Sequence, residues 1–150
     1  GAERPTSPSL DAFALDAVTF TRAYAPSPWT LPSVASILTG LGPLAHTVTE
    51  TNSTLPAEVE TLAERLGAAG YETAFFGSNL YLAPNRALNQ GFETYQGADG
   101  LTGEAINQRV AGFLGARTGD RPLFLYVHYF EPHCPYAPPE ALLASRKYLL

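Results

Sequence analysis

The segment SPWTLPSVASILTG, residues 27–40, contains a hydroxyl where a helix is expected to begin. Pro28 restricts the approach, and Pro32 suits the first turn of a helix because its missing N–H would have no partner there. Thr30 is therefore expected at or just before the helix N-cap. Unpaired N–H groups and the helix dipole favour an anion at this place by about 0.3–2 kcal/mol. A Thr30 alkoxide, or a bound phosphate or sulfate, would be stabilised there.

A simpler use of the same residues is helix capping. In this alternative interpretation, Thr30 or Ser33 only accepts a hydrogen bond from the first turn, which is the commonest role of such residues at a helix start. Gly40 is well placed to end the helix.

Histidines are the other candidates for chemistry. His133 follows an apolar run in the proline-rich loop EPHCPYAPP, residues 131–139, and His128 lies within that run. A neutral imidazole can ligate a metal, protonate a leaving oxygen or donate to an oxyanion. We interpret His133 as the stronger functional candidate, and His128 either as functional or as a buried core residue. His46 is most simply a solvated loop residue.

The acidic residues and the cysteine limit what the chain can build alone. Asp11, Asp16, Asp99 and Asp120 are scattered singly, and no Asp-Asp pair exists. A hard cation needs several carboxylates, so these residues do not complete a metal site. Cys134 is the single cysteine, which excludes an intrachain disulfide and a thiolate metal cluster.

Composition favours one globular domain without a nucleic-acid surface. The chain has 150 residues, 45% of them hydrophobic, and a formal net charge of −5. It has no cluster of basic residues of the kind that binds nucleic acid and no apolar run long enough to span a membrane. Both ends read as interrupted, so we expect a fragment of a longer protein.

Periodicity predicts alternating helices and strands. Apolar residues recur at helical spacing in 9–17, 55–69 and 102–116, with residues 55–58 opening the second helix and Gly70 ending it. Short strands are expected at 18–21, 71–77 and 91–95, and loops at 46–54 and 79–90. The run LFLYVHYF, residues 123–130, is apolar on both faces, as a central parallel strand is. The fold class is therefore α/β, with a largely parallel sheet flanked by helices.

Five motifs in the same order resemble those of sulfatases in the alkaline-phosphatase superfamily. The segment from Thr30 to Gly40 resembles the sulfatase nucleophile segment, in which Cys or Ser is followed by x-Pro-Ser-Arg and, further on, Leu-Thr-Gly. The others are RPTSPSLD at 4–11, FTRAY at 20–24, residues 55–71, and residues 124–139, which are similar to "FLYxHxxxPHxPYxPP". The resemblance implies an alkaline-phosphatase-like fold, with residues 1–150 as one partial catalytic domain truncated at both ends.

The resemblance also implies roles for individual residues. Thr30 stands at the position of the nucleophile, which in this family also ligates the metal, and His133 at that of a histidine that contacts the sulfate or phosphate. His128 and His46 match frequent family histidines and, with Ser33, are expected to contact substrate. The implied cofactor is a divalent metal, Ca²⁺ first and Zn²⁺ or Mn²⁺ as alternatives, with most ligands outside these residues.

Two departures from the family pattern change the expected chemistry. Sulfatases convert the nucleophile-position Cys or Ser to formylglycine, and this modification reads an Arg where Val34 stands. The β-carbon of Thr30 carries a methyl group, so oxidation cannot give that aldehyde. Threonine is the nucleophile in related phosphoesterases, and an unmodified nucleophile is therefore expected here.

The expected function is metal-dependent hydrolysis of sulfuric or phosphoric esters, although residues 1–150 alone should be inactive. The substrate would be a small-molecule, glycan or lipid ester. The alternatives are a phosphoethanolamine- or phosphoglycerol-type transferase and a catalytically silent sulfatase-like binding domain. A periplasmic, extracellular or membrane-tethered location would be typical of the family.

Overall fold

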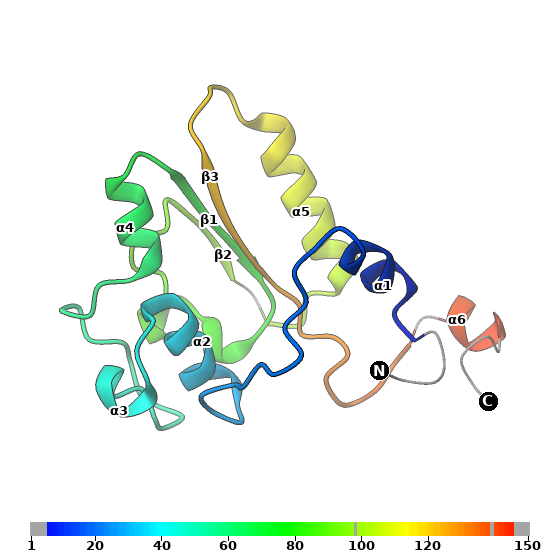
Figure 1. Ribbon diagram of the computed structural model, residues 1–150, viewed down its shortest axis with the longest axis horizontal. Coiled ribbons are helices and arrows are strands. Elements are labelled where there is room, and N and C mark those ends of the chain that lie inside the picture. Colours follow the sequence, from blue (N-terminus) through cyan, green and yellow to red (C-terminus); the bar gives the residue numbers. More distant parts are fainter. Residues whose placement is uncertain (1–5, 98, 139, 146–150) are drawn as a thin grey trace. The chain divides into compact units, whose positions relative to one another are not determined.

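The computed structural model describes residues 6–97, 99–138 and 140–145 and divides the chain into two compact units (Figure 1). The central unit comprises Ala25–Glu131. The other is formed by the two ends of the chain, Gly1–Tyr24 and Pro132–Leu150, and contains α1 (Pro8–Ala14) and α6 (Glu140–Ser145). The expectation of one partial domain stays a prediction.

A parallel three-stranded sheet organises the central unit. Its strands are β1 (Glu72–Gly77), β2 (Thr94–Gly97) and β3 (Leu123–His128), in the order β2-β1-β3. Glu72 pairs with Leu123 and Gly77 with His128, so β1 and β3 end together. The α/β class and the parallel sheet are confirmed. The central position expected for residues 123–130 is wrong: β1 is central, and β3 is an edge strand in the described part of the sheet, with half-buried residues.

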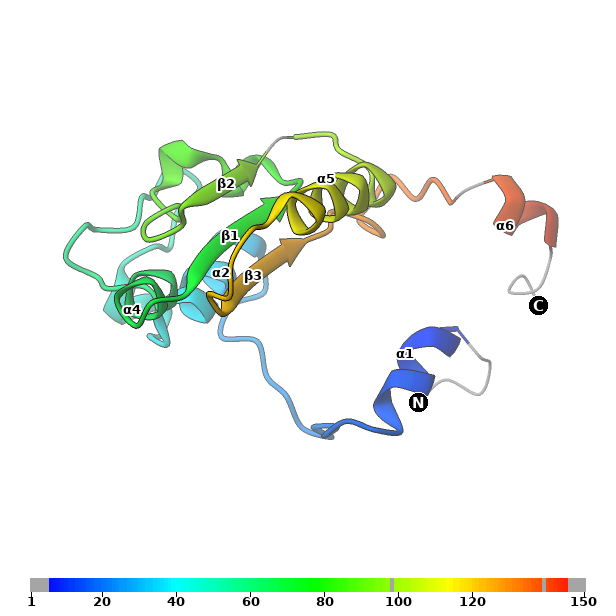
Figure 2. The same ribbon diagram turned by 90° about the horizontal axis from the view of Figure 1, so that it is seen from above.

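Helices cover both faces of this sheet (Figures 1 and 2). On one face lies α2 (Thr30–Thr39). Its residues Leu31 and Val34 form a core with the rings of Phe75 and Tyr126. On the other face, α5 (Gly103–Ala116) brings Ile106 against Ala74 and Phe76. Successive residues of a strand point to opposite faces, so the neighbours Phe75 and Phe76 serve different cores. The run Ala74–Phe76 in β1 is therefore apolar because both faces of this strand are covered.

The helix expected from residue 55 begins later than its periodicity suggested. The observed helix is α4 (Leu62–Ala68), and residues 55–61 are not helical. Thr61 starts α4 through a capping box: its hydroxyl accepts from the Glu64 N–H at 3.1 Å, and the Glu64 carboxylate accepts from the Thr61 N–H at 2.8 Å. The apolar spacing of residues 55–59 continues the pattern, but the capping box sets the boundary.

Other boundaries differ from the sequence-based prediction in smaller ways. The first helix is shorter than 9–17, β2 starts at Thr94 rather than Gly91, and the loop 79–90 contains the 3₁₀ turns η1 (Leu80–Leu82) and η2 (Pro84–Arg86). A further short helix is α3 (Pro43–His46). The strand expected at 18–21 is wrong, since this segment is irregular and Val18 is 83% exposed. Alternating apolar and polar residues do not make a strand unless a neighbouring strand pairs with the backbone N–H and C=O groups.

Removing the Thr61 hydroxyl should destabilise the central unit by about 2 kcal/mol. Besides capping α4, this buried hydroxyl donates to the Gln90 carbonyl at 3.0 Å, so Thr61→Ala removes two hydrogen bonds. Thr61→Ser, which keeps the hydroxyl, is the matched control. Chemical denaturation would give the two midpoints, and equal midpoints would contradict the role of the hydroxyl.

Candidate functional site

Thr30 lies at the start of α2, one residue after the N-cap. Thr30 is the first helical residue after the N-cap Trp29, whose backbone is extended, and Pro32 lies in the first turn. The helix ends at Gly40, which adopts a left-handed conformation with φ of 71°. Trp29 is held by an edge-to-face contact with Tyr81, with ring centroids 5.4 Å apart. The first-turn position of Pro32 and the end at Gly40 are confirmed, whereas the position expected for Thr30, at or just before the N-cap, is wrong by one residue because Trp29 is the N-cap.

The Thr30 and Ser33 hydroxyls do not cap the helix. The N-cap residue has no side-chain cap, and neither hydroxyl has a hydrogen-bond partner among the residues that the structure describes. The capping interpretation is therefore wrong. Both side chains are half-buried and can still hydrogen bond to a ligand.

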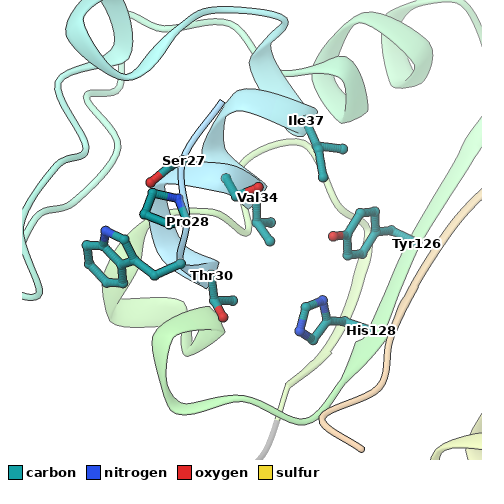
Figure 3. Close-up of a pocket in the computed structure, with 9 residues that line it drawn as sticks. Ser27, Pro28, Thr30, Val34, Ile37, Tyr126 and His128 are labelled. Atoms are coloured by element: carbon teal, nitrogen blue, oxygen red, sulfur yellow. The ribbon is translucent and has the colours of Figure 1, made fainter. Parts of the chain in front are cut away.

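A pocket of about 450 Å³ lies between α2 and β3. In Figure 3, Thr30 and His128 face each other at one end, and Ile37 and Tyr126 approach each other from α2 and β3 at the other end. Within the part of the chain that the structure describes, no charged side chain lines this pocket; its residues are Ser27, Pro28, Trp29, Thr30, Ser33, Val34, Ile37, Tyr126 and His128. The pocket thus presents the Thr30 hydroxyl opposite His128 at one end, and the Ile37 side chain with the Tyr126 ring and hydroxyl at the other.

His128 is positioned at the carboxyl end of β3. Its backbone carbonyl accepts from the Ser78 N–H at 3.1 Å, and its ring is nearly parallel to Tyr126, with centroids 6.3 Å apart. Gly77 opposite leaves the necessary room, because an added Cβ would lie 3.0 Å from the His128 Cβ. Burial lowers the pKa of His128 below its ordinary value. The imidazole is therefore neutral near pH 7 and can accept or donate one proton.

His133 belongs to the unit formed by the two chain ends, whereas Thr30 and His128 belong to the central unit. Its ring is exposed, and Nδ1 lies 2.8 Å from the Cys134 carbonyl oxygen. The structure thus brings Thr30 and His128 together, and joint action of Thr30 with His133 stays a prediction.

His46 is not a solvated loop residue: it is fully buried. Its Nε2 lies 2.9 Å from the Ser36 Oγ, and its Nδ1 accepts from the Val48 N–H at 3.1 Å. It does not line the pocket. Because both ring nitrogens have protein partners, this geometry gives no support to substrate contact by His46.

The free energy of unfolding should fall as the pH decreases from about 7.5 to about 5.5. Burial is the largest cause that lowers the pKa of both His46 and His128 below the ordinary 6.5. The unfolded chain therefore takes up protons first, so this stability is present above about pH 6.5 and is lost below it. Denaturation midpoints across this range would measure the effect.

The matched variants are His46→Gln and His128→Gln, each of which should show a shallower pH dependence than the wild type. His133→Gln retains both His46 and His128 and should keep that dependence. Equal slopes for all four proteins would contradict the assignment.

The described residues do not complete a metal site. No group of three or more His, Cys, Asp or Glu side chains gathers among them. The side-chain hydroxyl and imidazole groups that line the pocket within the described part of the chain belong to Ser27, Thr30, Ser33, Tyr126 and His128, without a carboxylate among them. This donor set does not fit a hard divalent cation by itself.

Two pocket residues escaped the sequence analysis. Tyr126 lies two residues before His128 and so shares its face of β3, and Ile37 lies seven residues after Thr30 on one face of α2. These spacings would have identified Tyr126 and Ile37 as pocket residues, but only if Thr30 and His128 had already been known to face one cavity.

The sequence model of the sulfatase family matches residues 1–148. The chain belongs to the sulfatase family. It is 41% identical over 93 residues to an ulvan-active sulfatase of Formosa agariphila, which covers 62% of this chain and 18% of that protein. It is 35% identical over 107 residues to human arylsulfatase A, covering 65% and 21% respectively. This sulfatase-family chain thus spans about a fifth of the length of these relatives.

Solved structures support the same fold. A protein determined with its substrate D-glucosamine-2-N,6-O-disulfate superimposes with a TM-score of 0.79 at 24% identity, covering 93% of this chain and 32% of that one. The phosphonate monoester hydrolase of Agrobacterium radiobacter gives a TM-score of 0.76 at 22% identity, covering 93% and 39%. The alkaline-phosphatase-like fold class is confirmed. Among the described residues, no helix is long and apolar enough to cross a bilayer.

Proposed function

We propose that the complete protein hydrolyses sulfuric or phosphoric esters and uses Thr30 as an unmodified nucleophile. The observation that supports this most is the Thr30 hydroxyl, which has no partner among the described residues and faces a pocket across from His128. Membership of the sulfatase family and the names of its sulfatase relatives support the class of reaction.

The reaction would proceed through a covalent enzyme ester. Thr30 Oγ forms a bond to sulfur or phosphorus while the bond to the leaving oxygen breaks, and the hydroxyl proton passes to neutral His128. The leaving oxygen takes up a proton, for which we propose His133 as donor. Water then attacks sulfur or phosphorus and passes a proton to His133, while the bond to Thr30 Oγ breaks and His128 returns its proton to that oxygen, which restores the hydroxyl and both histidines. A depressed pKa of His128 suits a proton acceptor near neutral pH.

The helix start would bind the anionic part of the ester. Thr30 and Leu31 place unpaired N–H groups at the N-terminus of α2, and the helix dipole adds positive potential there. Ser33, one turn further on, is proposed to donate to a non-bridging oxygen. These groups would compensate for the lack of a charged residue in the pocket lining.

The substrate and the cofactor are proposed more broadly. We propose a glycan, lipid or small-molecule ester, since one relative is named for activity on ulvan and one neighbour was solved with a sulfated glucosamine. The phosphonate monoester hydrolase among the neighbours keeps phosphorus esters in the proposal. A divalent ion, Ca²⁺ first and Zn²⁺ or Mn²⁺ next, would need most of its ligands from outside residues 1–150.

The second candidate function is a catalytically silent sulfatase-like domain that binds esters or a partner. Among the described residues, the pocket lining offers no charged side chain to bind an anion, and this favours the candidate. A transferase would differ from both in passing its phosphoryl-linked group to an alcohol instead of water.

Assays of the full-length protein separate these functions. p-Nitrophenyl sulfate, p-nitrophenyl phosphate and bis-p-nitrophenyl phosphate would be tested before and after chelation, with Ca²⁺, Zn²⁺ or Mn²⁺ then restored. Chelator-sensitive turnover of at least one ester is expected. Failure on every ester and metal would favour the silent domain, and faster release of p-nitrophenol with an added alcohol acceptor would favour the transferase.

A further inference from the structure

A buried imidazole connects α2 with the segment that follows it. His46 ends α3 and has no exposed surface, and its nearest polar group on α2 is the Ser36 hydroxyl, 2.9 Å from Nε2. The Pro32 carbonyl, in the first turn of α2, also lies close enough to the ring to favour its protonated form, although burial outweighs this effect and lowers the pKa. His46 thus lies beside two successive turns of α2, at Pro32 and at Ser36.

The other side of the ring fixes which nitrogen carries the proton. Val48 N–H donates to Nδ1 at 3.1 Å, so Nδ1 must present a lone pair and Nε2 must carry the hydrogen that points to Ser36. The intervening Thr47 adopts a left-handed conformation with φ of 61°, which is uncommon for a residue other than glycine. This bend returns the chain to the ring, and Val48 is itself fully buried in the core that contains Leu31.

These hydrogen bonds supply direction that apolar packing lacks. The buried face of α2 is apolar except for Ser36, and its apolar contacts, although collectively large, are non-directional. A hydrogen bond weakens steeply when its angle changes. Since the N-cap of α2 makes no side-chain bond, the Ser36–His46 contact is the side-chain hydrogen bond that fixes this helix to α3 within the described residues.

We propose that His46 is a positioning residue for Thr30. It holds α2 through Ser36 and so keeps the Thr30 hydroxyl aimed across the pocket, while its ring touches neither pocket nor ligand. This inference rests on the proposed function, because it assigns His46 to the same reaction. A misplacement of about 1 Å in a reacting group can cost about 100-fold in rate.

The test uses the full-length protein and the ester that it turns over fastest. His46→Gln and the milder Ser36→Ala should each lower kcat about 10- to 100-fold per folded molecule, with KM changed less than about threefold. The double variant should lose little more than the worse single variant, because both remove one contact. Thr61→Ala is the matched control: it destabilises the same unit at α4 and should leave kcat per folded molecule unchanged.

Hydrogen–deuterium exchange gives a readout that does not depend on activity. His46→Gln and Ser36→Ala should speed exchange in residues 30–36 more than in 62–68, and Thr61→Ala should do the reverse. Unchanged kcat and unchanged exchange at 30–36 in both variants would overturn the inference. Faster exchange at 30–36 in a protein that hydrolyses no ester would support positioning of α2 and refute the proposed function.

Discussion

Replacing Thr30 with alanine should lower turnover of the full-length protein by at least about 1,000-fold. Thr30→Ala removes the only proposed acceptor of the sulfuryl or phosphoryl group and leaves the helix start in place, since Thr30 caps nothing. Substrate binding should change far less, because the backbone N–H groups of α2 remain. Steady-state kinetics on the best p-nitrophenyl ester would show a loss in kcat rather than a rise in KM.

Two further variants test whether the effect belongs to the hydroxyl. Thr30→Ser keeps the hydroxyl and should retain most of the turnover, whereas Ser33→Ala should cost about 10-fold, as expected for one lost hydrogen bond to substrate. A covalent sulfo- or phospho-adduct should form on Thr30 in the wild type and be absent from Thr30→Ala by mass spectrometry. Full turnover by Thr30→Ala would refute the nucleophile assignment.

Replacing Gly91 with alanine should destabilise the protein by about 3–5 kcal/mol. Gly91 has a φ of 78°, and a Cβ added there would lie 2.3 Å from the Glu64 backbone nitrogen and 2.7 Å from the Ala63 carbonyl carbon. These are backbone atoms of α4 and cannot move aside like the end of a flexible side chain. The substitution would also disturb Thr73, whose hydroxyl donates to the Gly91 carbonyl at 2.6 Å. Chemical denaturation would measure the loss.

Two glycines in open surroundings separate backbone strain from steric conflict. Gly70 has a φ of 91° but no atom within 4 Å of an added Cβ, so Gly70→Ala should cost only about 1–2 kcal/mol. Gly112 lies inside α5, also in open space, and Gly112→Ala should stabilise the protein by about 0.5–1 kcal/mol. If Gly91→Ala costs no more than Gly70→Ala, the predicted conflict with α4 is wrong.

The fold was predictable where local signals agree with tertiary packing. The helix at 102–116 and the strand at 71–77 combine the right period with clear ends: Thr102 accepts from the Ala105 N–H at 3.3 Å as the N-cap of α5, and Gly70 precedes β1. The order of strands was not predictable from composition. β3 (LFLYVH) is more apolar than β1 (ETAFFG), yet the pairing of both β2 and β3 with β1 makes β1 the central strand of the described sheet.

The site was predictable in its hydroxyl and less so in its histidines. Two prolines and a following glycine fix the ends of α2, and hence the place of Thr30, from local rules alone. The burial of His46 depends on Ser36 and Val48, which reach it only because α3 folds back on α2. Whether His46 is buried or solvated therefore depends on tertiary contacts, which local sequence patterns do not show.

The outer side of β3 has a consequence for handling this protein. LFLYVH, the sequence of this strand, has no proline, glycine or charged residue, and the strand stands at an edge of the described sheet. Exposed backbone donors and acceptors beside such side chains form a template onto which a second chain can add. Shortened versions that leave this edge bare should therefore self-associate at high concentration, and a lysine in place of one of its half-buried residues should suppress that aggregation.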